Sequence, residues 1–201
     1  NRYSPCGRSS PEEMVERAIE VGLEGLVFTE HNILWPAEEL EALQARYPAI
    51  RLLRGIEVVS AEGDDYLVYG ITQEGLFAAH MDALELIRRV RARDGVVVLA
   101  HPYRYRPEVP ALLDQHPVDG IEIYSNNILN YAHPRARALC EKLGCFATAA
   151  SDAHVVDTLG LYALRLNDPV RDERELAQAL RRRAFVLHID DARVAAKNAE
   201  I

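Results

Sequence analysis

Short apolar segments alternate with amphipathic helical segments over most of the chain, and this alternation constrains the fold more than any other feature. The clearest apolar run is residues 96–100, which read Val-Val-Val-Leu-Ala. It follows a segment in which Leu84, Ile87 and Val90 recur at helical spacing. Strands that alternate with helices favour a parallel sheet, so the sequence predicts an α/β fold.

The alternation continues without a linker rich in Gly, Ser or Pro, which predicts a single domain over residues 1–201. Six or seven strand–helix units in a chain of 201 residues suit a small or distorted barrel as well as an open sheet. Both architectures place functional side chains at the carboxyl ends of the strands. The residues that follow the predicted strands are therefore the first candidates for a functional site.

Composition excludes some classes of function. The formal net charge of −8 argues against a broad surface for long nucleic acids, although bound cations would still allow a small anionic substrate. Three cysteines form no even disulfide framework, which favours a reducing, cytoplasmic setting. No apolar run approaches the ~20 residues that a membrane span needs. The sequence indicates no oligomeric state.

Residues that commonly bind metal ions follow five of the predicted strands. They are Glu30 with His31, Glu57, His101, Glu122, and Asp152 with His154. The other histidines, His80, His116, His133 and His188, lie elsewhere and are interpreted as structural or solvated. A helix cap and a solvated imidazole explain Asp152 and His154 equally well when these two are taken alone. The recurrence of the pattern favours a metal site, and mixed His and carboxylate ligands suit Zn, Mn or Fe.

Several ligands at one edge of a sheet suggest more than one ion. Two ions ~3.5–4 Å apart are the usual apparatus for hydrolysing phosphate esters. Arg104, three residues after His101, is placed to hold a phosphate by a bidentate contact. A surface salt bridge is the alternative interpretation of Arg104.

Six short motifs together resemble the polymerase and histidinol phosphatase (PHP) superfamily, in the order typical of that family and over nearly the whole chain. They are Tyr3-Ser4-Pro5-Cys6-Gly7 with Ser10-Pro11-Glu12-Glu13, Gly25-Leu26-Val27-Phe28-Thr29-Glu30-His31-Asn32, Gly55-Ile56-Glu57-Val58, Ala100-His101-Pro102-Tyr103-Arg104, Gly120-Ile121-Glu122-Ile123-Tyr124, and Ser151-Asp152-Ala153-His154. The resemblance implies a distorted, TIM-like, seven-stranded (β/α) barrel with a trinuclear metal site.

The resemblance also implies a role for individual residues. Glu57 resembles the carboxylate that bridges two ions, His101 a ligand of the second ion, and Asp152 a ligand of the first. His31 and His154 resemble ligands of the third ion. Cys6 stands where many members have an Asp or His ligand to that ion. It is interpreted either as a thiolate ligand or as a small buried side chain.

The chain departs from the family pattern in three places. The family's first strand ends in His-x-His just before the stretch that matches residues 1–4. Either that strand and motif precede residue 1, which we expect because the later motifs are intact, or the first metal site is incomplete. Glu30 replaces the usual Asp before His31. Asp65 stands where a His is common, so either Asp65 binds the second ion or that ion has one ligand fewer.

The resulting hypothesis is a metal-dependent phosphoesterase with two or three divalent ions (Zn, Mn or Fe). Its expected substrate is a small phosphate ester, a nucleotide or a short oligonucleotide, hydrolysed by metal-activated water. The alternative is a non-catalytic or regulatory module that keeps the PHP fold and its metal ions as structure.

Overall fold

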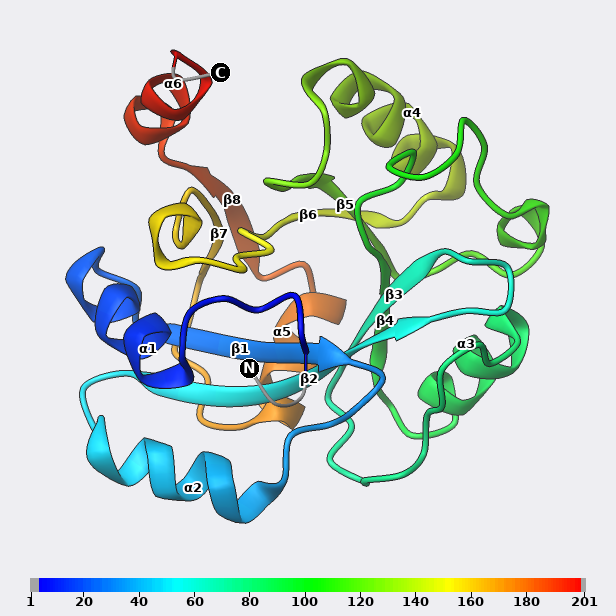
Figure 1. Ribbon diagram of the computed structural model, residues 1–201. Coiled ribbons are helices and arrows are strands. Elements are labelled where there is room, and N and C mark those ends of the chain that lie inside the picture. Colours follow the sequence, from blue (N-terminus) through cyan, green and yellow to red (C-terminus); the bar gives the residue numbers. More distant parts are fainter. Residues whose placement is uncertain (1–3, 200–201) are drawn as a thin grey trace.

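A computed structural model describes residues 4–199 and shows an α/β fold built on one curled, half-barrel sheet (Figure 1). The sheet has six strands in the order β1-β2-β3-β4-β5-β6, and β7 and β8 form a separate two-stranded sheet. In chain order the strands are β1 (Gly25–His31), β2 (Arg51–Val59), β3 (Asp65–Tyr69), β4 (Val96–Leu99), β5 (Gly120–Tyr124), β6 (Phe146–Ala149), β7 (Tyr162–Leu166) and β8 (Phe185–Ile189).

The six-stranded sheet is mixed, so the prediction of a parallel sheet is wrong at β3. Strands β1 and β2 are parallel, and so are β4, β5 and β6, but β3 is antiparallel to both of its neighbours. Only residues 60–64 join β2 to β3, whereas a parallel crossover needs a dozen or more. Gly63, with φ of +83°, helps the chain to reverse there. The first residue of β3 therefore lies beside the carboxyl-terminal ends of β2 and β4.

Four helices cover the outer face of the sheet. They are α1 (Pro11–Glu20), α2 (Ala37–Arg46), α3 (Ala83–Arg91) and α4 (His133–Leu143). Alternate strand residues such as Ile56 and Ile121 pack outward against Leu86 of α3 and Leu139 of α4. A second cluster joins β1 and β2 to α1 and α2. Helix α1 starts with a capping box, in which Ser10 is the N-cap and Glu13 is the third residue of the helix.

Helix α5 (Glu173–Arg181) lies on the opposite, concave face of the sheet (Figure 1). Its Leu176 and Leu180 pack among inward-facing residues that include Leu53 and Val98. Gly70, just after β3, allows this approach, because a Cβ there would lie 2.5 Å from the Cβ of Ala177. The helix thus fills the end of the half barrel away from the first residue of β3.

The remaining segments are short. Three of them are 3-10 turns, η1 (Ala111–Asp114), η2 (Asn130–Ala132) and η3 (Val156–Thr158). Helix α6 (Asp191–Ala199) was not predicted. Among residues 4–199, no helix combines the length and the apolar character that crossing a membrane requires.

Candidate metal centre

Buried ionisable side chains gather on the concave face, at the edge of the sheet opposite α5. Glu57 lies on β2, Asp65 begins β3, His101 follows β4 and Glu122 lies on β5. All four are buried. They reach the same edge because β2, β4 and β5 run toward it and β3 runs away from it.

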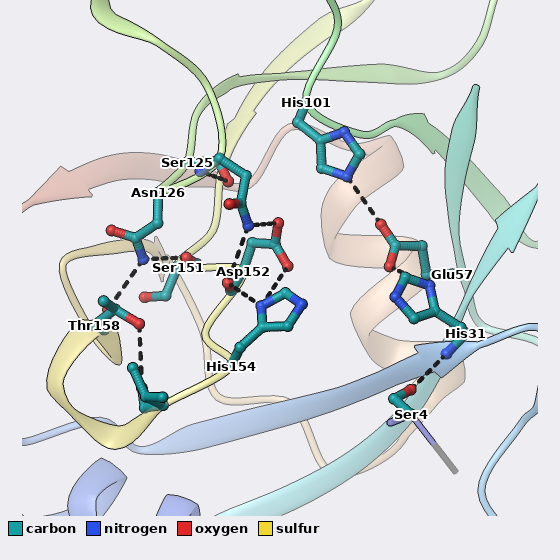
Figure 2. Close-up of polar contacts among 12 residues, drawn as sticks. Ser4, His31, Glu57, His101, Ser125, Asn126, Ser151, Asp152, His154 and Thr158 are labelled. Atoms are coloured by element: carbon teal, nitrogen blue, oxygen red, sulfur yellow. Dashed lines mark hydrogen bonds and ion pairs between the residues drawn. The ribbon is translucent and has the colours of Figure 1, made fainter. Parts of the chain in front are cut away.

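Glu57 is the centre of this arrangement (Figure 2). Its Oε2 lies 3.0 Å from Nδ1 of His31, and its Oε1 lies 3.1 Å from Nε2 of His101. Burial alone would raise the pKa of Glu57, but the contacts with His101 and His31 outweigh burial and lower it to about 2. The contact with Glu57 in turn raises the pKa of His31 to about 9, although burial acts in the opposite direction. The carboxylate is therefore ionised and faces two imidazoles, one at the end of β1 and one just after β4.

A first group of possible metal ligands contains Glu57, Asp65 and His101. Their ligand atoms all lie within 4.8 Å of one another, and Oδ2 of Asp65 is 3.7 Å from Nε2 of His101. Burial, and then the charge of Glu57, raises the pKa of Asp65. The structure thus brings Asp65 to the predicted ligands of the second ion. Two carboxylates and an imidazole are a donor set that suits Zn, Mn or Fe.

A second group contains Cys6, His31 and His154, whose ligand atoms also lie within 4.8 Å of one another. Two contacts hold the amino-terminal segment here: the His31 N–H donates to Ser4 Oγ at 3.0 Å, and the Arg8 N–H donates to the carbonyl of His154 at 2.8 Å. Cys6 is exposed, so the interpretation of this residue as a small buried side chain is wrong. A sulfur and two ring nitrogens are donors that Zn and Fe accept.

Asp152 belongs to neither group within the described residues, and Figure 2 shows it beside His154, across the site from Glu57. Its Oδ1 lies 3.7 Å from Nδ1 of His154, and its Oδ2 lies 3.8 Å from Nη1 of Arg104. The backbone of Asp152 has φ of +46°, a conformation that non-glycine residues adopt at a cost and that is frequent at functional sites. Asp152 and Arg104 therefore form one wall of the site.

Sequence reasoning gave no role to two residues that support this wall. The Asn127 side-chain amide donates to the Asp152 carboxylate, and the Asn126 side-chain amide donates to the backbone carbonyl of Ser151. Asn126 also donates to the carbonyl of Thr158 at 3.3 Å. Both Asn residues follow β5 directly after Ser125. The one sequence signal for a role of these residues in the site was their position just after β5, the strand that carries Glu122.

Glu122 also has a clear structural function. It is only 1% exposed, and its Oε2 accepts a hydrogen bond of 2.9 Å from the backbone N–H of His101. Burial raises the pKa of Glu122 to about 8, and the nearby charges of Asp152 and Glu57 contribute to the increase. Glu122 thereby fixes the backbone of His101, whose φ of +22° is unusual.

The site opens into a cavity of about 1220 Å³ on the concave face. Its lining includes Glu57, His101, Glu122, Asp152 and His154, and it continues along β1. Neither ligand group contains any of the four histidines interpreted as structural or solvated, as far as residues 4–199 are described.

Comparisons with known proteins agree with this architecture. Residues 130–185 match a family model described as PHP-associated, and these residues include Asp152 and His154. Among the curated proteins, none matches the sequence significantly.

Three solved structures have a similar fold. PsfC from Pseudomonas syringae PB-5123 is 20% identical, with 94% of this chain and 87% of that chain covered and a TM-score of 0.67. A two-domain protein from Bacteroides vulgatus ATCC 8482 contains a predicted PHP-like metal-dependent phosphoesterase; it is 17% identical, with 94% and 62% covered and a TM-score of 0.73. A protein from Bifidobacterium adolescentis ATCC 15703, described as a metal-dependent phosphoesterase, is 17% identical, with 90% and 93% covered and a TM-score of 0.61.

Proposed function

We propose that the chain is a PHP superfamily domain and a metal-dependent hydrolase that cleaves phosphoester bonds, as the PHP-associated match over residues 130–185 and the fold of the structural neighbours support. The observation that carries the proposal is the position of Glu57. Its two carboxylate oxygens face His31 and His101, each of which belongs to a different group of ligand-type side chains. A carboxylate between two such groups is suited to bridge two cations.

The residues present fit two or three divalent ions, with Zn, Mn and Fe as the candidates. Glu57, Asp65 and His101 would hold one ion, and Cys6, His31 and His154 would hold another. Asp152 would contribute to a further ion together with Glu57. Divalent ions held there would act as Lewis acids toward the phosphate ester and activate the attacking water.

The chain's own groups would bind and orient the substrate. Arg104 lies beside Asp152 at the mouth of the site, and its guanidinium is suited to bind two oxygens of one phosphate. Asn127 would hold the carboxylate of Asp152 in place, and Glu122 would hold the backbone of His101. We assign Arg104 the substrate contact and the other two residues positioning roles.

The proposal also covers the number of strands in the barrel. We expect a distorted seven-stranded barrel whose first strand, ending in His-x-His, precedes residue 1. In support, β1 and β6 are the two edges of the sheet formed by the described residues, and the cavity runs along β1. A strand placed between these edges would add ligands next to Asp152 and Glu57.

The proposed substrate is a small phosphate ester, a nucleotide or a short oligonucleotide. The net charge of −8 is unfavourable for long nucleic acids. The three free cysteines agree with a reducing compartment, and we propose the cytoplasm.

Hydrolysis assays on the full-length protein test the proposal. Monoester and diester substrates would be offered to protein loaded with Mn, Zn or Fe, and the metal content per chain would be measured. We expect two or three ions per chain, with activity that Asp152→Ala reduces by at least about 100-fold. Metal-loaded protein without hydrolysis, or an unchanged Asp152→Ala variant, would contradict the proposal, and bound ions without hydrolysis would indicate a structural module.

A further inference from the structure

Two thiols lie close together at the junction of α4 and β6, outside both ligand groups of the candidate metal centre. Sγ of Cys140, in the last turn of α4, is 3.2 Å from Sγ of Cys145, which immediately precedes β6. Both are free thiols. The Cys145 backbone N–H also donates to the Cys140 carbonyl at 3.2 Å. The two backbones are therefore in direct contact.

The end of α4 produces this contact. Gly144 has φ of +67° and reverses the chain as the helix C-cap, and a Cβ there would meet nothing within 4 Å. The Arg183 guanidinium donates to the Gly144 carbonyl at 2.7 Å and holds the reversal from outside the helix. Because only residues 141–144 separate the two cysteines, closing a covalent loop between them costs little chain entropy.

We propose that Cys140 and Cys145 form a reversible dithiol–disulfide pair that is oxidised by a peroxide. One thiolate attacks a peroxide oxygen and becomes a sulfenic acid, and a hydroxide ion leaves. The second thiol attacks the sulfenic sulfur, the S–S bond forms, and the sulfenic oxygen leaves as water. In the net reaction two thiols lose two protons and two electrons, and hydrogen peroxide is reduced to two molecules of water.

The surroundings favour this chemistry at Cys140. The hydrogen bond from the Cys145 thiol lowers the pKa of Cys140, and Arg183 also acts in this direction, whereas burial opposes both. Cys140 is buried, but Cys145 beside it is partly exposed and gives a small oxidant a route to the pair. A cytoplasmic disulfide of this kind is normally transient and redox-sensing.

Neither a metal site nor simple packing explains the pair better. The groups that could hold an ion within residues 4–199 contain Cys6 but neither Cys140 nor Cys145. Cys140 packs in the main apolar cluster, but packing alone does not require the second sulfur to face the first.

Mass spectrometry tests the proposal in full-length protein carrying Cys6→Ser, which removes the exposed third thiol of residues 1–201. After a few equivalents of hydrogen peroxide, we expect the thiols of Cys140 and Cys145 to disappear and the mass to fall by about 2 Da. Proteolysis should yield the two cysteine peptides joined, and dithiothreitol should restore both thiols. Gain of oxygen at either sulfur without loss of hydrogen, or covalent dimers in place of the internal bond, would overturn the proposal.

Cys145→Ser in the same background is the matched control. It leaves Cys140 without a partner, so peroxide should give a sulfenic acid that gains about 16 Da and reacts with dimedone. Loss of 2 Da in this variant would show that another group reacts, and the proposal would be wrong. The joined peptides of the Cys6→Ser protein remain decisive even if the control folds poorly.

Discussion

Asp65 and His101 form a contact that joins opposite ends of two neighbouring strands. Oδ2 of Asp65, the first residue of β3, is 3.7 Å from Nε2 of His101, which follows the last residues of β4. The Ala100 N–H donates to the Asp65 carbonyl at 3.0 Å and fixes the two segments together. This contact exists because β3 is antiparallel to β4. Asp65 therefore joins Glu57 and His101 as the third possible metal ligand of this group.

Asp65→Asn should remove one ion from the metal-loaded protein. The amide is a weaker ligand than a carboxylate and leaves the first group with one anionic donor, so hydrolysis should fall by about 10–100-fold. Metal content per chain and kcat are the measurements. Asp64→Asn is the matched control, because Asp64 pairs with Arg106 at 3.1 Å and is outside both ligand groups. Equal metal content in the two variants would rule out Asp65 as a ligand.

The contact between His31 and Glu57 should make the stability of the metal-free protein depend on pH. The pKa of His31 is raised from 6.5 to about 9, so its stabilising contribution is complete below pH 6.5 and is lost as the pH rises through 9. The pKa of Glu57 is lowered from 4.5 to about 2, so its contribution is complete above pH 4.5 and is lost as the pH falls toward 2.

Urea unfolding of chelator-treated protein from pH 6 to pH 10 measures the alkaline half of this dependence. The parent and His31→Gln should differ most in free energy of unfolding at the acid end of this range and converge toward pH 10. A difference that stays constant across the range would mean that the imidazolium of His31 does not contribute.

Asn127→Ala should impair the site without unfolding the protein. Loss of the amide that donates to Asp152 leaves this carboxylate free to turn, so metal affinity or kcat should fall by about 10–100-fold. Unfolding free energy should change by no more than about 1 kcal/mol, since Asn127 is only part-buried. Asn130→Ala, three residues further on and exposed, is the control. Equal activities of the two variants would refute the positioning role.

Gly70→Ala should destabilise the fold by about 2–5 kcal/mol. Alanine must adopt φ of +81° there, which costs about 1–2 kcal/mol, and its Cβ would overlap Ala177 of α5, which adds about 1–3 kcal/mol. Gly22→Ala isolates the first contribution, because Gly22 has φ of +80° and nothing within 4 Å of an added Cβ. Chemical denaturation of both variants measures the difference in free energy of unfolding. Equal destabilisation would show that α5 shifts to accommodate the added Cβ at little cost.

Local sequence patterns were enough to predict the alternation of strands and helices and several residues of the candidate site. Ser10 and Glu13 mark the start of α1, and the apolar run before His101 marks β4. These features depend on near neighbours in the chain, through capping contacts and side-chain periodicity. The predicted roles of these residues in metal binding remain to be tested by the experiments above.

The sequence by itself determined which side chains end up at the strand ends, because each is set by the residues next to it in the chain. Only the tertiary structure decided the burial of α5 in the half barrel and the contact of Asn127 with Asp152. These depend on the order and direction of segments far apart in sequence. A pattern of neighbouring residues does not encode that information, because the packing free energy that selects it is spread over the whole core.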